Sequence, residues 1–288
     1  MNANHPVNSL TIAAALDVAG ARLAATHTDS AGLDAEVLLA HTLNKPRSHL
    51  RAWPEQVLLP QQQQDFFVLI DARAAGRPVA YLTGRREFWS LNLRVNSDTL
   101  IPRPDTERLV ELALERIPAD RDYCIADIGT GSGAIALAIA SERPRCRVIA
   151  TDISPRALAI ATHNAHQLDL SNLNFREGDG VAALHGERVD MICSNPPYLA
   201  EDDPHLLDGD ISAEPRGALV AGPTGLEMLE QLARTAPAHL REAGWLLLEH
   251  GYQQGAAVAE LLTLLHYRCV RTFHDYADQP RITLGQRG

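Results

Sequence analysis

A glycine-rich loop between a strand and a helix places the strongest constraint on this sequence. The loop runs from Asp127 to Gly133, after an expected strand at 123–128 and before an expected helix at 133–143. Glycines allow such a loop to turn tightly and to approach a ligand closely. Asp152 ends the next expected strand, where a carboxylate can accept hydrogen bonds from ribose hydroxyls. The pattern predicts a nucleoside cofactor that contacts Asp127, Gly129, Thr130, Gly131, Ser132, Gly133 and Asp152.

Strands and helices alternate after residue 120, which predicts a doubly wound α/β sheet of the Rossmann-like type. The last two strands are joined by a short turn through Asp278, so we expect them to be antiparallel. Strands are expected at 123–128, 147–151, 174–177, 189–194, 245–249, 269–274 and 281–284. Helices are expected from the run 102–107 to about 116, at 133–143, from 155, at 226–240 and at 255–266.

The residues before this alternation have a different character. Apolar residues at helical spacing over 10–25, 33–43 and 60–75 predict a small helical bundle, which either stabilises the chain or docks a partner. The stretch 87–95 alternates and is rich in aromatic residues, which suits a strand or hairpin. The predicted division is a helical domain at 1–76, a hairpin linker at 77–101 and a catalytic domain at 102–288.

Composition argues against several classes of function. The net charge of −10 is poor for a protein that must neutralise the phosphates of nucleic acid. The four cysteines are far apart in the sequence, which indicates reduced thiols in a cytoplasmic protein rather than disulfides or a zinc site. Asp17 and Arg22 interrupt the alanine-rich N-terminal stretch, so neither a signal peptide nor a membrane span is expected. His163 and His166 suit a solvated helix face, and no metal is predicted.

The glycine loop alone fits two cofactors. With Ala134, the run Gly129-x-Gly131-x-x-Ala134 also satisfies the dinucleotide fingerprint, so an NAD enzyme competes with an S-adenosylmethionine enzyme. Asp127 favours S-adenosylmethionine, because its carboxylate lies just before the glycines and could bind the methionine ammonium through water. The motif Asn195-Pro196-Pro197-Tyr198, which follows the expected strand at 189–194, favours it further.

This second motif suits methyl transfer to a poorly nucleophilic nitrogen. The lone pair of an amide nitrogen or an exocyclic amine is delocalised, so the site must hold the nitrogen with that pair directed at the methyl carbon. The side-chain oxygen of Asn195 and the carbonyl of Pro196 can each accept one N–H of the target. Pro196 and Pro197 stiffen the loop, and Tyr198 offers a flat face to a planar group. The predicted catalytic residues are Asn195, Pro196 and Tyr198.

The chain resembles the release factor glutamine methyltransferases in several separate stretches. Asn-Pro-Pro-Tyr after the fourth strand is typical of amino-nitrogen methyltransferases, both adenine-specific DNA enzymes and protein glutamine enzymes. The further matching stretches are 78–84, 87–89, 100–107, the glycine loop, 214–215 and 248–251. Because they extend from about residue 45 to the C-terminus, the similarity is not confined to one motif.

The resemblance implies a seven-stranded class I methyltransferase domain, a β-hairpin linker and an N-terminal domain that docks a release factor. The implied reaction uses S-adenosylmethionine to methylate the glutamine of a Gly-Gly-Gln loop. Asn195 would contact the cofactor, and Asn195, Pro196, Pro197 and Tyr198 would bind the glutamine amide, with Phe88 packing against it.

The sequence departs from the family at Gly180, where members often carry a large apolar or aromatic residue. Gly180 follows Asp179, and only its backbone could approach the adenine of the cofactor. Two alternatives stay open: an adenine-specific DNA methyltransferase, and a glutamine methyltransferase that acts on a ribosomal protein. The run 103–107 is intact here and is usually absent from the ribosomal-protein enzymes.

An acidic stretch follows the Asn-Pro-Pro-Tyr motif. It carries Glu201, Asp202, Asp203, Asp208 and Asp210. It suits either a solvated loop or a mobile lid that shapes the substrate entrance.

Overall fold

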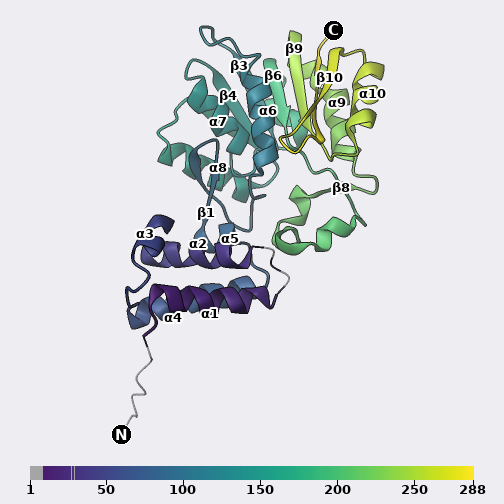
Figure 1. The fold of residues 1–288 in the computed structure, drawn as a ribbon. Coiled ribbons are helices and arrows are strands. Elements are labelled where there is room, and N and C mark those ends of the chain that lie inside the picture. The colour runs from purple at the N-terminus through teal and green to yellow at the C-terminus, as the bar shows by residue number, and fades with distance from the viewer. Residues whose placement is uncertain (1–8, 27, 29) are drawn as a thin grey trace. The chain divides into compact units, whose positions relative to one another are not determined.

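The computed structural model describes residues 9–26, 28 and 30–288 (Figure 1). The chain forms two compact units. The first contains the N-terminal residues up to Gly84 together with Leu207–Ala213, and the second contains Arg85–Leu206 and Glu214–Gly288. The helices of the described residues include none that is long and apolar enough to cross a membrane.

The first unit is helical, as the apolar spacing predicts. Its core is formed by residues such as Leu23 of the first helix, Leu38 and Leu39 of the second and Phe66 of the fourth, all fully buried. The short helices α3 and α5 were not predicted, because neither is long enough to show a helical period. The helices are α1 (Ile12–Ala24), α2 (Ala31–Leu43), α3 (Arg47–Ala52), α4 (Pro60–Ala74) and α5 (Val79–Thr83), with the 3₁₀ turn η3 (Gly209–Ala213).

The second unit is built on a seven-stranded sheet, which confirms the predicted fold class. β3, β4, β5, β6 and β9 are parallel, and β11 pairs antiparallel with both β9 and β10, as the short turn at Asp278 predicts. In spatial order the strands are β10 (Arg268–His274), β11 (Pro280–Gln286), β9 (Leu240–Glu249), β6 (Val189–Ser194), β3 (Cys124–Ile128), β4 (Arg147–Asp152) and β5 (Leu173–Glu177).

Helices cover both faces of this sheet (Figure 1). Successive strand residues point to opposite faces, so Ile125 packs in one hydrophobic cluster while Cys124 and Ala126 pack in the other. The first cluster includes α6 (Pro104–Leu114), α7 (Ala134–Glu142) and α8 (Pro155–Gln167). The second includes the 3₁₀ helix η1 (Gly180–Leu184), α9 (Glu227–His239) and α10 (Gly255–Leu264). Because both faces are covered, the ends of the strands are the places where a ligand can reach the sheet.

A β-hairpin precedes the sheet, as the alternating stretch suggests. It consists of β1 (Arg85–Phe88) and β2 (Leu91–Arg94), with φ of 54° at Trp89 and 58° at Ser90. Positive φ at both central residues is the mark of a type I′ turn. The side chain of Asn164 on α8 accepts from the backbone N–H of Arg94 at 2.8 Å and donates to its carbonyl at 3.0 Å, so the hairpin is hydrogen-bonded to α8.

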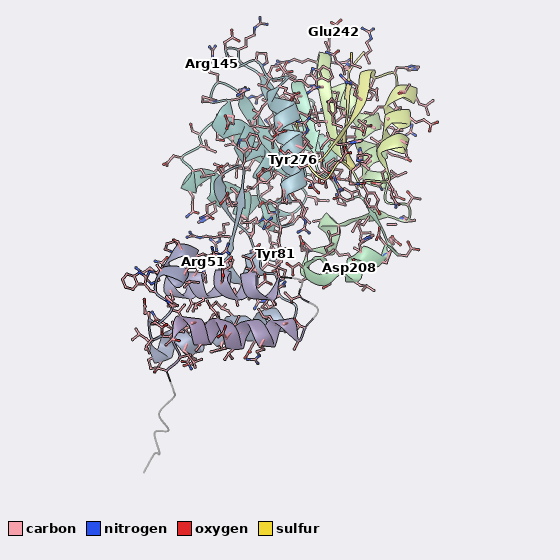
Figure 2. All side chains as sticks on the ribbon, viewed as in Figure 1. Arg51, Tyr81, Arg145, Asp208, Glu242 and Tyr276 are labelled. Atoms are coloured by element: carbon pink, nitrogen blue, oxygen red, sulfur yellow. The ribbon has the colours of Figure 1, made fainter. Side chains whose placement is uncertain are left out.

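The turn between β10 and β11 is hydrogen-bonded to α6. It carries Tyr276, labelled in Figure 2, whose hydroxyl donates to Glu111 at 2.5 Å. The acidic stretch after the Asn-Pro-Pro-Tyr motif contains short elements that the sequence does not predict. They are β7 (Leu199–Ala200), the 3₁₀ helices η2 (Pro204–Leu207) and η4 (Arg216–Ala218), and β8 (Val220–Gly222), which pairs with β7.

Candidate active site

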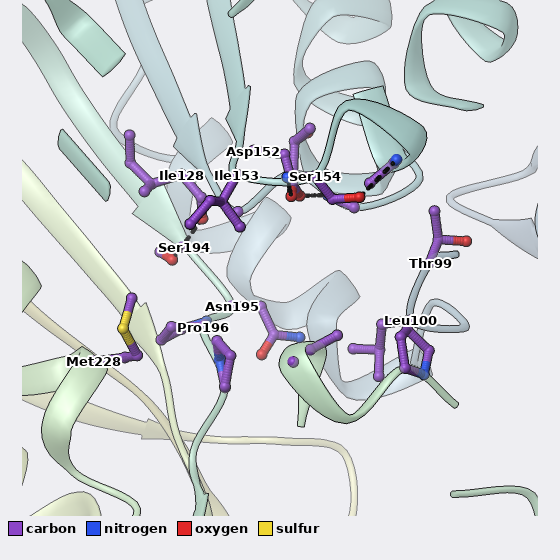
Figure 3. A pocket seen from close by; sticks show the side chains of 18 of the residues that line it. Thr99, Leu100, Ile128, Asp152, Ile153, Ser154, Ser194, Asn195, Pro196 and Met228 are labelled. Atoms are coloured by element: carbon purple, nitrogen blue, oxygen red, sulfur yellow. Dashed lines mark hydrogen bonds between the residues drawn. The ribbon is translucent and has the colours of Figure 1, made fainter. Parts of the chain in front are cut away.

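A cavity of about 580 Å³ opens in the second unit at the carboxyl ends of the central strands (Figure 3). The glycine loop after β3, Asp152 at the end of β4 and Asn195 after β6 all line it. In Figure 3, Asn195 and Pro196 lie near the centre, with Asp152, Ile153 and Ser154 above them. The structure therefore brings together the two motifs that the sequence analysis selected separately.

The glycine loop bends over the end of β4. The backbone N–H groups of Gly129 and Thr130 both donate to the carbonyl of Thr151, at 2.9 and 2.8 Å. Gly129 and Gly131 have φ of 74° and 58°, and a Cβ on either would meet no protein atom within 4 Å. The loop thus presents bare backbone to the cavity, which is the surface that a closely approaching ligand needs.

Asp127 stabilises this loop through a hydrogen bond to Thr130. It is fully buried, and its Oδ2 accepts from the hydroxyl of Thr130 at 2.6 Å and from the backbone of Ala136 at 3.2 Å. Burial raises the pKa of Asp127 to about 7, and the nearby charge of Asp152 acts in the same direction. Among the described residues, none hydrogen-bonds Oδ1 of Asp127. Asp127 and Gly133 lie outside the cavity wall, whereas Gly129, Thr130, Gly131 and Ser132 form part of it.

Asp152 joins the glycine loop to the next helix. Its Oδ2 accepts from the backbone of Gly131 at 2.9 Å, and its Oδ1 accepts from the backbone of Ser154 at 2.8 Å. Ser154 in turn caps α8 by accepting from the backbone of Ala157 at 3.2 Å, the role its position before Pro155 predicts. Each carboxylate oxygen can accept more than one hydrogen bond, so Asp152 can still accept from a ligand in the cavity.

Several apolar residues of the cavity were not identified from the sequence. Ile153 is 68% exposed although it is large and apolar, and Met228 and Leu232 of α9 complete the wall. Gly180, at the start of η1, lines the same cavity with φ of 52°. These side chains offer apolar contact to a ligand in the same cavity to which Gly180 contributes backbone alone.

The Asn-Pro-Pro-Tyr motif begins directly after β6. The hydroxyl of Ser194 donates to the carbonyl of Ile128 at 2.7 Å, which connects the start of the motif to the end of β3. Asn195, Pro196 and Pro197 line the cavity, and the Nδ2 group of Asn195 donates to the hydroxyl of Thr106 at 3.2 Å.

Tyr198 lies outside the cavity wall. Its side chain packs against the hydrophobic cluster of α9 and α10, and burial raises its pKa well above the ordinary value. Its carbonyl accepts from Gln254 at 2.9 Å, which holds the end of the motif.

Glu214 explains one of the matching stretches that had no assigned role. Its side chain is fully buried; one oxygen accepts from the backbone of Ile101 at 2.9 Å, and the other pairs with Arg103. Arg103 and Pro215 both line the cavity. Glu214 therefore links the segment after η3 to the residues that precede α6.

Phe88 does not occupy the position that the resemblance implied. It is 1% exposed, lies outside the cavity wall, and packs with Leu109 and Leu112 of α6 in the hydrophobic core. The alternating pattern of β1 requires one face to be buried, and Phe88 lies on that face. Its position gives no support to a contact with substrate.

The described residues contain no group of three or more His, Cys, Asp or Glu side chains that could hold a metal ion.

The seven-stranded sheet, the glycine loop and the Asn-Pro-Pro-Tyr loop at one cavity define a methyltransferase of class I. Residues 14–84 match the family model described as the PrmC N-terminal domain, and residues 107–209 match the methyltransferase small domain. A methyltransferase structure from Pyrococcus furiosus has a TM-score of 0.50 and 18% identity, covers 69% of this chain and 89% of its own, and shows the fold alone.

Curated relatives identify the family within this class. The release factor glutamine methyltransferase of Vibrio cholerae is 48% identical over 279 residues, covering 96% of this chain and 97% of the relative. The release factor glutamine methyltransferase of Xylella fastidiosa is 51% identical over 254 residues, covering 88% of this chain and 92% of the relative. The chain belongs to the release factor glutamine methyltransferase family.

Proposed function

We propose that this protein transfers the methyl group of S-adenosylmethionine to the side-chain amide nitrogen of the glutamine in the Gly-Gly-Gln loop of peptide chain release factors. The observation that carries the proposal is the single cavity that both the glycine loop and Asn195 line. The names of the curated relatives support the substrate class.

The cavity fits S-adenosylmethionine. Gly129 and Gly131 leave open space where a side chain would project, and Asp152 retains acceptor capacity for ribose hydroxyls. Ile153 and the backbone of Gly180 would contact the adenine, and Asp127 would act indirectly, through the loop that it supports. When bound, the cofactor supplies a methyl group on a positively charged sulfur, which is an excellent leaving group.

The chain's own residues would orient the nucleophile. The Oδ1 of Asn195 and the carbonyl of Pro196 would accept the two N–H groups of the glutamine amide, so that the nitrogen faces the methyl carbon. Pro197 limits the motion of this loop, and Tyr198, packed behind it, would support the loop's shape. The methylated nitrogen is acidic enough to lose its proton to solvent, so a strong base is not required.

A protein substrate is favoured over DNA. The chain carries a net charge of −10, which opposes a phosphate backbone. Extracting an adenine from a duplex costs unstacking energy, whereas an extended protein loop presents its glutamine at little cost.

We also propose that the N-terminal helical part docks the release factor. The four cysteines are free, and we propose a cytoplasmic location on that basis.

The test is methyl transfer from labelled S-adenosylmethionine to a purified release factor and to duplex DNA in parallel. We expect label in the release factor, with mass spectrometry placing it on the Gly-Gly-Gln glutamine. Asn195→Ala should reduce turnover by about 100-fold or more, because positioning is most of the protein's work on a weak nucleophile. Binding of S-adenosylmethionine should fall less than turnover. Label in DNA with none in the release factor would overturn the proposal.

A further inference from the structure

A hydrogen bond joins the catalytic loop to Thr106, which lies beside a buried acid at the end of a neighbouring strand. β6 and β9 are adjacent and parallel, and Ser194 pairs in register with Leu248. The residues that follow them, Asn195 and Glu249, therefore lie at the same edge of the sheet. Thr106, in the first turn of α6, accepts from Nδ2 of Asn195 at 3.2 Å, and its hydroxyl lies near enough to the carboxyl of Glu249 to lower the pKa of that acid.

The chemistry of a hydroxyl sets the direction of both bonds. Because Thr106 accepts from Asn195, the only hydrogen of its hydroxyl is free to be donated to Glu249. An ionised carboxylate can only accept, so it fixes that direction. With Nδ2 of Asn195 bound to Thr106, the Oδ1 atom of the same planar amide points the other way and keeps its acceptor capacity.

Glu249 occupies an unfavourable position. It is 1% exposed, and among the described residues its Oε2 has no hydrogen-bond partner. Burying a carboxyl group without full hydrogen bonding costs free energy, and Glu249 is not part of the cavity wall. A buried acid of this kind at the edge of an active site is a candidate for a role in function.

We propose that Thr106 and Glu249 are positioning residues that hold the Asn195 amide with Oδ1 directed at the substrate nitrogen. This inference rests on the proposed function, in which Oδ1 of Asn195 accepts an N–H of the glutamine. An amide that rotated by half a turn would present Nδ2–H to the substrate instead. Two N–H groups cannot hydrogen-bond each other, so the rotated form would not orient the nucleophile.

The first experiment removes the hydroxyl of Thr106 without changing its shape. Thr106→Val should lower kcat for release factor methylation by about 10- to 100-fold, because orientation of the nucleophile is lost. The Kd for S-adenosylmethionine, measured by calorimetry, should change less than threefold, on the order of the scatter in such effects. Thr106→Ser keeps the hydroxyl and should retain most of kcat.

The matched control is Thr272→Val. Thr272 lies on the edge strand β10 and shares a hydroxyl hydrogen bond of 2.8 Å with Thr283, away from the cavity. This variant should leave kcat unchanged. If the wild type labels the release factor but Thr106→Val matches Thr272→Val in kcat, the positioning role is wrong. If the wild type fails to label the release factor, the proposed function itself fails.

The second experiment uses the ionisation of Glu249. Burial raises the pKa of Glu249 to about 7. The hydroxyl of Thr106 and the charges of Arg281 and Arg103 lower this pKa, and the charge of Asp105 raises it. Tyr198 also faces it. Below this pKa the protonated acid can donate to Thr106, which leaves the hydroxyl hydrogen of Thr106 for Oδ1 of Asn195 and favours the rotated amide.

The wild-type kcat should therefore rise with pH through about 7. Glu249→Gln cannot ionise, so its kcat should be lower than that of the wild type at pH 8 and nearly constant between pH 6 and 8, a range about one unit either side of neutrality. An unchanged pH profile in Glu249→Gln would refute the assignment even if Thr106→Val did not fold.

Discussion

At the scale of single residues, Asp152 combines structural support with the proposed binding of ribose. Its carboxylate accepts from the backbone of Gly131 and Ser154 and also lines the cavity. Asp152→Ala should weaken binding of S-adenosylmethionine by about 1–3 kcal/mol, the size of a hydrogen bond to a charged group. Glu177→Ala is a matched control, because Glu177 pairs in register with Asp152 and is exposed outside the cavity.

Isothermal titration calorimetry measures both variants of this pair. The control should bind S-adenosylmethionine as the wild type does, and neither protein should bind NAD. Equal affinities for Asp152→Ala and Glu177→Ala, or tight binding of NAD, would contradict the assignment of the cofactor site.

The burial of Asp127 predicts that the stability of the fold depends on pH. Burial raises its pKa from the ordinary 3.8 to about 7, so between these values the native state binds more protons than the unfolded state. The contribution of Asp127 to the free energy of unfolding therefore falls as pH rises through that window. Asp127→Asn keeps the shape and one acceptor oxygen for Thr130 and Ala136 but removes the ionisation.

The variant should therefore gain stability relative to the wild type as pH rises, by roughly 3–5 kcal/mol over the window. Urea unfolding at pH values from 4 to 8, roughly the span of the shift, measures the difference. Parallel curves of unfolding free energy against pH for the two proteins would show that Asp127 does not titrate in this range.

At the scale of elements, the sequence predicts what has a repeating pattern or strong end signals. The long helices α1, α2 and α4 were predicted because apolar residues recur along them at helical spacing. The strands of the sheet were predicted because strands and helices alternate along the chain after residue 120. The helix start at Ser154 was predicted from its cap and the proline that follows. The elements between 199 and 222 were not, because each is two to five residues long and shows no period.

The residues of the candidate site likewise divide into those that the sequence predicts and those that it does not. The glycine loop, Asp152 and Asn195 were predicted because each follows a strand, and strand ends meet at one edge of the sheet. Thr106, Glu249 and Ile153 were not, because their roles depend on which strands are neighbours and which side chains are exposed. No local pattern carries that information.

At the scale of the whole molecule, the chain passes between its two units more than once. The segment Leu207–Ala213 belongs to the helical unit, although Glu214 and the residues that follow it belong to the catalytic unit and line its cavity from Pro215 onward. Within the helical unit, Arg73 donates from Nε to Asp34 at 2.7 Å and also pairs with Asp210 of this segment. The acidic stretch is thus partly held by an ion pair, rather than being a wholly free lid.

This anchoring leads to a prediction about local motion. The side chain of Arg73 is 10% exposed and that of Asp210 is 39% exposed, so removing the charge of Asp210 leaves a largely desolvated Arg73 with one partner fewer. Asp210→Asn should raise local opening of 207–213 by roughly 5- to 150-fold, the equivalent of about 1–3 kcal/mol for a charge-assisted hydrogen bond. The matched control is Asp208→Asn, an exposed acid of the same segment that is labelled in Figure 2.

Hydrogen–deuterium exchange with mass spectrometry on the full chain separates the two variants. Exchange in 207–213 should accelerate in Asp210→Asn and stay at the wild-type rate in Asp208→Asn, since only Asp210 pairs with Arg73. The sheet is the slow reference, because its strands exchange only by opening of the larger core. The Michaelis constant for the release factor should rise in Asp210→Asn, because the segment that continues into the cavity wall loses an anchor. Equal exchange rates in the two variants would show that the ion pair does not restrain the segment.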